Sequence, residues 1–340
     1  MAFSLSLNQR FLFAKVEGTP GTMETLTGAD FNVLIRNPEI TPIVEWADDA
    51  SKSATGYHDE DEDIAGAQSA TIAFTVRLGI GDTISTNPNW VKFMNGCGLK
   101  DNGYSSTGVG LWPQAVYDNK TLTIWVYDVS TGADTPNGMV YKFAGCMGNC
   151  VVTQDGVGKP MVANFTFTGK CIDVEDVTTL PAGADFDTAH AEKALNQTLA
   201  FGGVNQKVSS WSLDLGNEIS PLINQGDLTG YDYYQITNRK PRLTANPLAM
   251  AVATDDAWGK MISGLTGTQA VFVTGISLTG ANIGLKIPRA QRVAAAPGNR
   301  EGIVSWDSNW RLLGNGWTGS LADSGLPAEA TFEILIGARA

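Results

Sequence analysis

The feature that most constrains the fold of this chain is an internal repeat. The segment NWVKFMNG (Asn89–Gly96) returns as AWGKMISG (Ala257–Gly264), with Trp, Lys, two large apolar residues and Gly in the same order. In each copy the apolar residues fall at i, i+3 and i+4, which predicts a short helix with one buried face that ends at the glycine. The predicted core residues are Trp90, Phe93 and Met94 in the first copy and Trp258, Met261 and Ile262 in the second.

Segments on both sides of these helices also correspond. SATIAFTVRL (Ser69–Leu78) alternates apolar and polar residues, which predicts a half-buried strand before the first helix, and KPRLTANPLAM holds the same place in the second copy. Further matches, in chain order, are Lys142 with Lys286, Gly158 with Gly302, Phe165 with Trp310, Phe167 with Leu312, and Gly169 with Gly314. Two chance helices would not keep this order, so we interpret the repeat as a duplicated unit.

The duplication predicts a mainly β chain with two tandem β-sandwich domains, each with one short α-helix and one long hairpin loop. We expect an N-terminal arm at 1–30, the first copy at 31–180, a linker at 181–194 and the second copy at 195–340. The composition fits this interpretation, because 43% of the 340 residues are apolar, only 17% are charged, and 38 are glycine.

Charge and hydropathy exclude several classes of function. The net charge of −12 argues against nucleic-acid binding through a basic surface. No window approaches the roughly 20 apolar residues of a membrane span. The N-terminal run is broken by Asn8, Gln9 and Arg10 and does not resemble a signal peptide, so we expect synthesis in a cytoplasm.

Motifs for chemistry are missing from the sequence. There is no G-x-S-x-G elbow, and GVGKP from Gly156 lacks the flanking residues of a phosphate loop. With only two histidines, His58 and His190, which lie far apart in the sequence, a Ser-His-Asp triad has few places to form. Cys146 and Cys150 are too widely spaced for a zinc knuckle, so the four cysteines are expected to be buried small hydrophobes. We therefore expect no enzyme activity, no cofactor and no metal.

Each copy contains one long connection that we expect to contact another subunit. In the first copy it carries the acidic run HDEDED, with Asp59, Glu60, Asp61, Glu62 and Asp63. Ile64 stands where a calcium loop needs glycine, so a calcium site is disfavoured, and a solvated loop remains the simpler alternative. In the second copy the connection carries Tyr231, Tyr233 and Tyr234, a composition typical of protein contacts. Candidate basic partners for the acidic run are Arg239, Lys240 and Arg242.

Three segments together resemble the major tail tube proteins of long-tailed, non-contractile bacteriophages. They are KVEGTPGT (Lys15–Thr22), SSWSLDLGNEISP (Ser209–Pro221) and the later block LKIPRAQRV…GNREGIVSWDSNW. The resemblance implies two tandem tail-tube-type domains. It also implies homotrimeric rings of pseudo-sixfold symmetry that stack into a tube, through which double-stranded DNA passes without specific binding.

The same resemblance implies a place in the virion tail after assembly in the host cytoplasm, with other tail proteins at the two ends. The acid excess suits a channel wall that does not hold DNA, and the Thr-rich strands 71–77 and 121–127 are candidate wall strands. The alternative is another virion β-sandwich protein, of the baseplate, decoration or carbohydrate-binding kind, in which some of the nine tryptophans would line a sugar groove.

Overall fold

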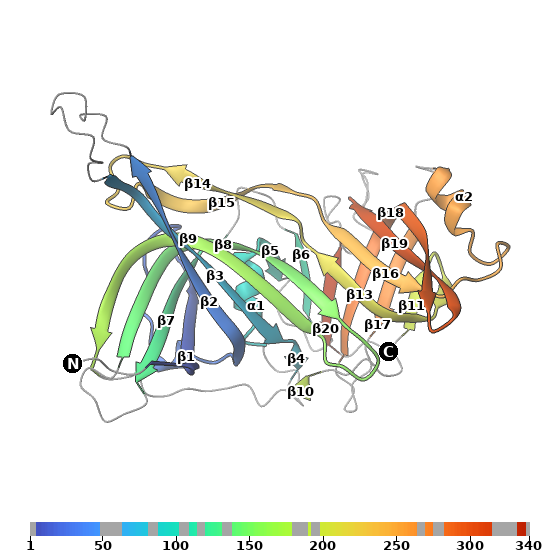
Figure 1. The fold of residues 1–340 in the computed structure, drawn as a ribbon, viewed down its shortest axis with the longest axis horizontal. Coiled ribbons are helices and arrows are strands. Elements are labelled where there is room, and N and C mark those ends of the chain that lie inside the picture. The colour runs from blue at the N-terminus through green and yellow to red at the C-terminus, as the bar shows by residue number, and fades with distance from the viewer. Residues whose placement is uncertain are drawn as a thin grey trace, which may run out of the picture.

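The computed structural model describes residues 5–47, 63–80, 88–101, 109–113, 120–130, 138–178, 190–191, 198–263, 269–274, 282–314 and 332–337. The chain is mainly β with a large antiparallel sheet, as the sequence predicts. In Figure 1 the first half of the chain (blue to green) and the second half (yellow to red) follow one another along the longest axis of the molecule, and one yellow hairpin of the second half extends over the first.

The first unit is a curved antiparallel sheet in the order β2-β3-β9-β8-β7-β1 (Figure 1). Residues alternate across it, so that Ile72, Phe74 and Val76 of β3 are buried while Thr71 and Thr75 are half-exposed. Its elements are β1 (Leu5–Val16), a 3₁₀ turn (Gly28–Asp30), β2 (Ile35–Ala47), β3 (Ile64–Arg77), β4 (Gly79–Ile80), α1 (Val91–Gly96), β5 (Leu99–Asp101), β6 (Val109–Pro113), β7 (Leu122–Ser130), β8 (Gly138–Gln154), β9 (Val162–Val177) and β10 (His190–Ala191).

The second unit has a sheet in the order β13-β16-β19-β18-β17-β11. Strands β14 and β15 leave this sheet and form a two-stranded hairpin of their own. The elements are β11 (Thr198–Phe201), β12 (Val204–Gln206), β13 (Val208–Asp214), β14 (Asn217–Ile223), β15 (Tyr231–Arg239), β16 (Arg242–Pro247), α2 (Ala257–Ile262), β17 (Gln269–Thr274), β18 (Asn282–Arg300), β19 (Ile303–Leu313) and β20 (Glu333–Gly337).

The two strand orders correspond position by position, and in both units the helix follows the second strand of the order along the chain. Phe74 lies opposite Phe165 in the first unit, and Leu243 lies opposite Trp310 in the second. The glycines matched in the sequence, Gly158 and Gly302, both have positive φ (78° and 85°) in the turn between the two longest strands. A side chain would be strained there, which explains why both copies keep glycine.

The two units are not separate sandwiches, because their sheets and cores are continuous. Strand β13 of the second unit pairs with β8 of the first, and β20 pairs with β6. One cluster of buried apolar side chains extends from Leu12 through Phe165 and Trp211 to Ile334. The expected boundary near 181–194 is therefore a change of unit along the chain and not a break in packing.

The expected N-terminal arm contains a strand of the first unit. Residues of β1 pair with β7 over Arg10–Val16, and the Arg10 guanidinium makes an ion pair with Asp128. Of the expected linker 181–194, the described part is His190–Ala191, which pairs with β4. The N-terminal residues were expected to form an arm, but they supply an edge strand of the first unit.

Helix α1 lies in the core of the first unit, and Trp90, Phe93 and Met94 are all buried. The indole N–H of Trp90 donates to the carbonyl of Gly79 at 2.9 Å. The ring of Phe93 lies 4.9 Å from Phe74, and the neighbouring phenylalanines of β9 complete an aromatic cluster.

Helix α2 does not occupy the equivalent place, which corrects the sequence prediction for the second copy. Trp258 is 50% exposed and Ile262 is 74% exposed, and Met261 is half-buried. In this unit the ring of Trp310 is covered by Phe201, stacked at 4.6 Å, and by the guanidinium of Arg292 at 5.0 Å. The same helical pattern is thus left at the surface because other side chains cover the core.

This difference predicts unequal effects of two matched substitutions. Trp90→Ala should lower the free energy of unfolding of the unassembled chain by about 3–5 kcal/mol, because it opens a cavity in a close-packed core. Trp258→Ala, at the matched position of the repeat, should lower it by less than about 1 kcal/mol. Denaturant unfolding of both variants measures this, and equal losses would contradict the different placement of the two helices.

Candidate functional site

The junction between the units is a short antiparallel strand pair. Trp211–Asp214 of β13 lie opposite Val151–Gln154 of β8, and the N–H of Leu215 donates to the carbonyl of Cys150 at 3.1 Å. Strand β8 has 17 residues and β7 only 9, so β7 covers one end of this edge of β8 and leaves the other end for β13. The junction is therefore built from an edge that the first unit cannot cover by itself.

The junction has an apolar side and a polar side. Leu213 and Val152 lie opposite each other and are both buried in the shared core. Ser212 and Thr153 also lie opposite each other, but on the outer face, where both are half-exposed. The alternation of the two strands thus carries the same two faces from one unit into the next.

The outer face of this continuous sheet is lined by hydroxyl and amide side chains. They are Thr71, Thr75, Asn149, Thr153, Asn164, Thr166, Ser212, Thr244 and Asn309, all exposed or half-exposed. Over β13, β16 and β19 the face holds a groove of about 310 Å³ with the carboxylates of Asp155 and Asp307 in its lining. The sheet thus presents one broad polar surface that spans both units.

Two expectations about this surface need correction. Charges of both signs lie on the face: Arg36, Arg242 and Arg311 are interspersed with Glu39, Asp214 and the two carboxylates of the groove, so the described face is mixed in charge and not uniformly acidic. The strand over 121–127 does not contribute, because its threonines are buried against the N-terminal segment.

The hairpin β14–β15 of the second unit crosses back over the first unit, above β8 and β9 in Figure 1. Tyr234 and Ile236 of β15 pack on Met147 of β8, and Ile219 of β14 lies against this cluster. All but Ile219 are buried. Apolar contact on the outer face is thus confined to the end that the hairpin covers.

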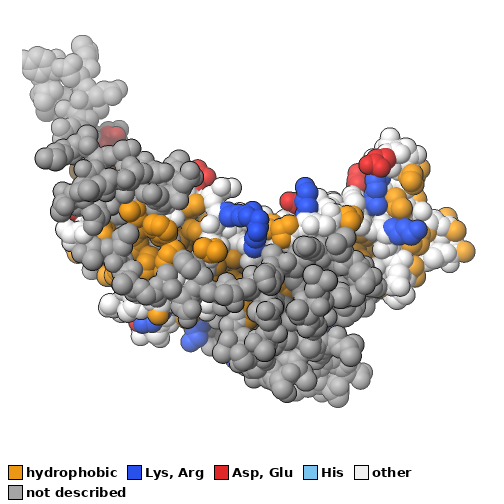
Figure 2. Space-filling view, turned by 90° about the horizontal axis from the view of Figure 1, so that it is seen from below, with side chains coloured by type: hydrophobic (Ala, Val, Ile, Leu, Met, Phe, Trp, Pro, Cys, Tyr) orange, Lys and Arg blue, Asp and Glu red, His pale blue; other side chains and the backbone are white. Residues whose placement is uncertain are grey.

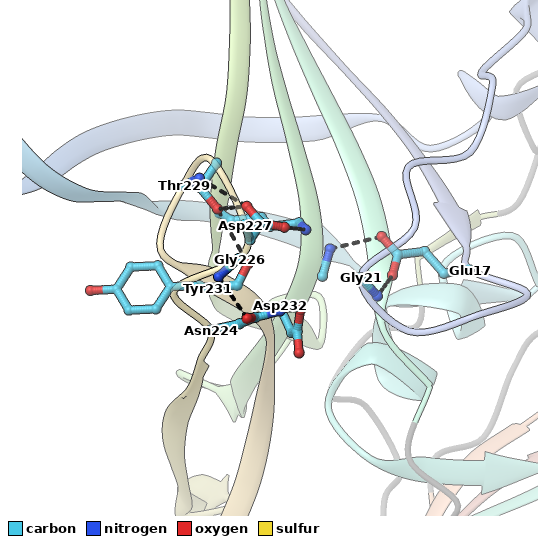
Figure 3. Close-up of polar contacts among 10 residues, drawn as sticks. Glu17, Gly21, Asn224, Gly226, Asp227, Thr229, Tyr231 and Asp232 are labelled. Atoms are coloured by element: carbon cyan, nitrogen blue, oxygen red, sulfur yellow. Dashed lines mark hydrogen bonds and ion pairs between the residues drawn. The ribbon is translucent and has the colours of Figure 1, made fainter.

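Polar contacts fix the tip of this hairpin to the first unit (Figure 3). The ammonium group of Lys170 on β9 donates to Asp227 at 2.9 Å, and the hydroxyl of Tyr231 donates to Glu45 on β2 at 2.8 Å. Burial together with the bond to Glu45 raises the pKa of Tyr231 to about 12. Burial alone would raise the pKa of Asp227, but hydrogen bonds from Lys170 and Thr229 outweigh it and lower this pKa.

The base of the hairpin binds the backbone that follows α1. The side-chain amide of Asn217 donates to the carbonyl of Cys97 at 2.8 Å and to that of Gly148 at 2.9 Å. The guanidinium of Arg239 donates to the carbonyl of Gly98 at 3.0 Å. Burial lowers the pKa of Arg239 to about 10. Its hydrogen bond to Gly98 joins the hairpin of the second unit to the first unit.

A buried carboxylate fastens the N-terminal segment beneath the hairpin. Glu17 accepts hydrogen bonds from the backbone N–H groups of Gly21 (2.7 Å) and Gly145 (2.8 Å) and from the hydroxyls of Thr121 and Thr123. Figure 3 shows Glu17 and Gly21 beside the hairpin residues. The four donors satisfy a carboxylate that is otherwise removed from water.

Close approach of the backbones requires glycine at two of these places. Gly21 has φ 77°, and a Cβ there would lie 2.3 Å from the carbonyl oxygen of Asp232. Gly145 has φ 61°, and a Cβ there would lie 2.8 Å from the Cβ of Tyr233. Glycine at both positions lets β15 lie directly on the first unit.

The predicted contact residues of the second hairpin serve a contact within the chain. Tyr231 and Tyr234 are buried against the first unit, and Tyr233 is half-buried against Gly145. Tyr231 and Tyr234 are therefore not available to another ring, which corrects their assignment as contacts between rings. Sequence composition indicated a contact, but it could not indicate that the partner is the first unit of the same chain.

The acidic run of the first hairpin is only partly described. Asp63 is exposed at the start of β3, while Asp59, Glu60, Asp61 and Glu62 lie outside the described residues. Of the three candidate basic partners, Arg242 is exposed on β16, and the other two make contacts within the chain. The guanidinium of Arg239 binds backbone carbonyls of the first unit, and Lys240 makes an ion pair with Glu218 on its own hairpin.

Several contact residues were missed in the sequence. Glu17 lies within the segment KVEGTPGT, where a single carboxylate among small residues was a usable signal. Lys170 follows the apolar alternation FTFTG directly, and a lysine at the end of such a run also indicates a specific partner. Asn217 and Arg239 carried no comparable signal.

No protein-family model and no curated protein matches this chain. Among the described residues, no helix has the length and hydropathy needed to cross a membrane. In the same part of the chain, no three His, Cys, Asp or Glu side chains are grouped as metal ligands would be. The most distinctive features of the described chain are the β8–β13 junction, the polar outer face of the sheet and the β14–β15 hairpin.

Loss of the Lys170–Asp227 pair should loosen the hairpin. Asp227→Asn leaves the nearly buried ammonium group without its counter-charge, and we expect docking to weaken by about 1–3 kcal/mol. Amide exchange in β15 should quicken accordingly. Glu218→Gln is the matched control, because it breaks an exposed ion pair on the same hairpin, and equal effects of the two changes would contradict this role.

The same pair predicts a pH dependence. The pKa of Asp227 is lowered in the folded chain, so its contribution is complete above the unfolded value of about 3.9 and is lost as the pH falls through the lower folded value. Amide exchange in β15, measured relative to the sheet core, should therefore quicken only in strong acid.

Glu17→Gln should destabilise the first unit. The amide group places N–H donors against N–H and O–H donors, so at least one buried donor loses its acceptor, at a cost of about 1–3 kcal/mol. Glu24→Gln changes a half-exposed carboxylate in the same loop and should have a smaller effect. Thermal unfolding of the two variants distinguishes these outcomes, and unchanged stability of Glu17→Gln would refute the role of this carboxylate.

Proposed function

We propose that this chain is a structural subunit of a bacteriophage tail tube, the conduit for DNA ejection. Three chains form a ring of six similar units, and rings stack into the tube. The observation that carries the proposal is the β8–β13 junction, which joins two units of the same topology, head to tail, into one sheet. A head-to-tail contact leaves its two complementary surfaces unused at the ends, so it propagates until a ring closes.

The unpaired edges of the isolated chain support this proposal. Strand β2 ends the sheet on one side, and its outer edge pairs with no strand in the described part of the chain. Exposed edges favour uncontrolled aggregation unless they are paired, and ring closure pairs them. Two units on one chain also raise the effective concentration of each unit for its neighbour.

The polar face supports the role of a conduit. Closure of the sheet into a ring would surround a channel with a wall of threonine, serine and asparagine, with charges of both signs. Among the described residues of this face, Arg36, Arg242 and Arg311 are interspersed with Glu39 and Asp214, so the wall has little net positive charge to hold the phosphate backbone during transit. Nonspecific passage of double-stranded DNA requires this property.

The first hairpin supports stacking. In Figure 1 the upper ends of β2 and β3 extend beyond the sheet, next to the tip of the β14–β15 hairpin. Their exposed apolar residues are Ile43, Trp46 and Ile64. We assign this hairpin, with its acidic loop, to the contact with a neighbouring ring.

Electron microscopy of the purified protein tests the function. We expect rings with a central channel, and tubes of stacked rings at high protein concentration. Averaged end views should show sixfold-like density with threefold symmetry, because the two hairpins of each chain differ. Isolated globules at all concentrations, above all with affinity for glycans, would refute the proposal in favour of another virion β-sandwich protein.

A further inference from the structure

The junction pairs an edge of β8 with an edge of β13, and the equivalents of both edges elsewhere in the sheet have no partner strand within the described residues. The counterpart of β13 in the first unit is β2, and the counterpart of β8 in the second unit is β18. Strand β18 has 19 residues and β17 only 6, so β17 pairs with β18 no further than Ala290. Beyond Ala290, β18 pairs only with β19 within the described residues. The edge of β2 and the end of β18 therefore repeat, without a partner, the two edges that pair inside the chain.

Strand register fixes the residues on the β2 side. Phe74 corresponds to Leu243, because they lie opposite Phe165 and Trp310 respectively. Thr75 therefore corresponds to Thr244. Arg36 lies opposite Thr75, and Ser212 lies opposite Thr244, so Arg36 is the counterpart of Ser212.

Strand register fixes the β18 side in the same way. Val162 corresponds to Asp307, since each lies three residues before the matched aromatic of its strand. Thr153 lies opposite Val162, and Ala296 lies opposite Asp307, so Ala296 is the counterpart of Thr153. Within the chain Ser212 faces Thr153. Between chains the same relation brings Arg36 opposite Ala296.

We infer that β2 of one chain pairs antiparallel with the end of β18 of a second copy, with Arg36 opposite Ala296. The inference rests on the proposed function and adds the residues and the register of the contact between chains. The two edges lie toward opposite ends of one sheet, so the occupant is a second copy and not the same chain (Figure 1).

The residues around this contact between β2 and β18, which we call the seam, fit a short strand pair. Pro297 cannot donate to a ladder, so it limits pairing at one end, and prolines in sheets are confined to such edges. The guanidinium of Arg10 donates to the carbonyl of Pro38 at 3.0 Å, which limits the seam at the other end. Leu34, beside the seam on β2, is 67% exposed, and Val293 on β18 is also exposed, so pairing would cover apolar surface at both edges.

Hydrophobic side chains are exposed around the β18 side of this contact. Figure 2 shows hydrophobic side chains at the surface on both halves of the molecule, including the end that carries α2 and the tips of β18 and β19. Among the described residues of that end, the exposed ones are Val252, Trp258, Ile262, Val293, Ile303 and Val304. A second chain at β18 would lie next to this surface.

A paired-cysteine experiment tests the register. Arg36 and Ala296 are both exposed, so cysteines there should not disturb folding. At a non-hydrogen-bonded antiparallel pair the Cα atoms are about 4.5 Å apart, within the range of a disulfide. In the double variant Arg36→Cys/Ala296→Cys, copper phenanthroline should oxidise the two thiols across each contact and give covalent dimers and trimers on a non-reducing gel.

Matched controls separate this register from random oxidation. All variants carry Cys171→Ser, because Cys171 is half-buried whereas Cys97, Cys146 and Cys150 are buried. In this background each single variant should give no ladder beyond a dimer. The off-register variant Arg36→Cys/Ala294→Cys should crosslink at least about ten-fold less, because two residues of displacement exceed disulfide reach. On the unsubstituted protein, amide exchange at Ala295 should slow on assembly.

The outcomes distinguish the inference from the proposed function. If tubes form but Arg36→Cys/Ala296→Cys does not crosslink, or amide exchange at Ala295 does not slow on assembly, the β2–β18 contact is wrong and the proposed function is unaffected. Crosslinked trimers that never form a channel overturn the tube and support the seam. Monomers by sedimentation at every concentration, with no crosslinking, overturn both.

Discussion

The architecture depends on a mismatch of length between neighbouring strands. In each unit the longest strand projects well beyond the strand beside it, so part of its edge has no partner within the unit. A bare edge of backbone N–H and C=O groups is unfavourable unless another strand covers it. In the first unit β13 covers it, and this pairing makes one sheet and one core out of two repeats. The continuous sheet and the shared core of the two units both depend on this uncovered segment of β8.

The β8–β13 pairing makes the sheet continuous, and the buried polar contacts fix how the second unit lies on the first. Apolar packing alone would allow the hairpin β14–β15 to slide along the first unit, since the cluster beneath it is small. Glu17, Lys170 and Arg239 each have to meet particular partners from another part of the chain, and each would leave an unsatisfied buried group if displaced. The glycines at 21 and 145 allow the backbones to approach closely enough for those bonds to form. We regard specificity of placement as the main effect of these groups.

The sequence predicts the parts of this structure that depend on local pattern. The repeat, the mainly β class, the burial pattern of β3, the position of both helices in the chain and the turn glycines at 158 and 302 all follow from spacing and residue type. Local pattern does not say which edge meets which, so the continuous sheet and the incorporation of β1 were not foreseen. The exposure of α2 was missed for a related reason, because Trp258 repeats the pattern of Trp90 while Phe201 and Arg292, far away in the sequence, cover the core instead. The tyrosines of the second hairpin were recognised as contact residues, but their partner is decided by the fold.

The two hairpins have diverged, although they hold equivalent places in the repeat. Both expose apolar residues, Ile223 and Leu228 on one and Trp46 and Ile64 on the other. They differ in that β14–β15 is held against the first unit by tyrosine, lysine and arginine contacts. A duplicated chain can change one copy without changing the other, which a ring of identical single-unit subunits cannot do. In the ring proposed above, any protein that binds the end of the assembly would therefore encounter alternating sites of two kinds. Its own symmetry would be matched to three positions around the circumference, and not to six.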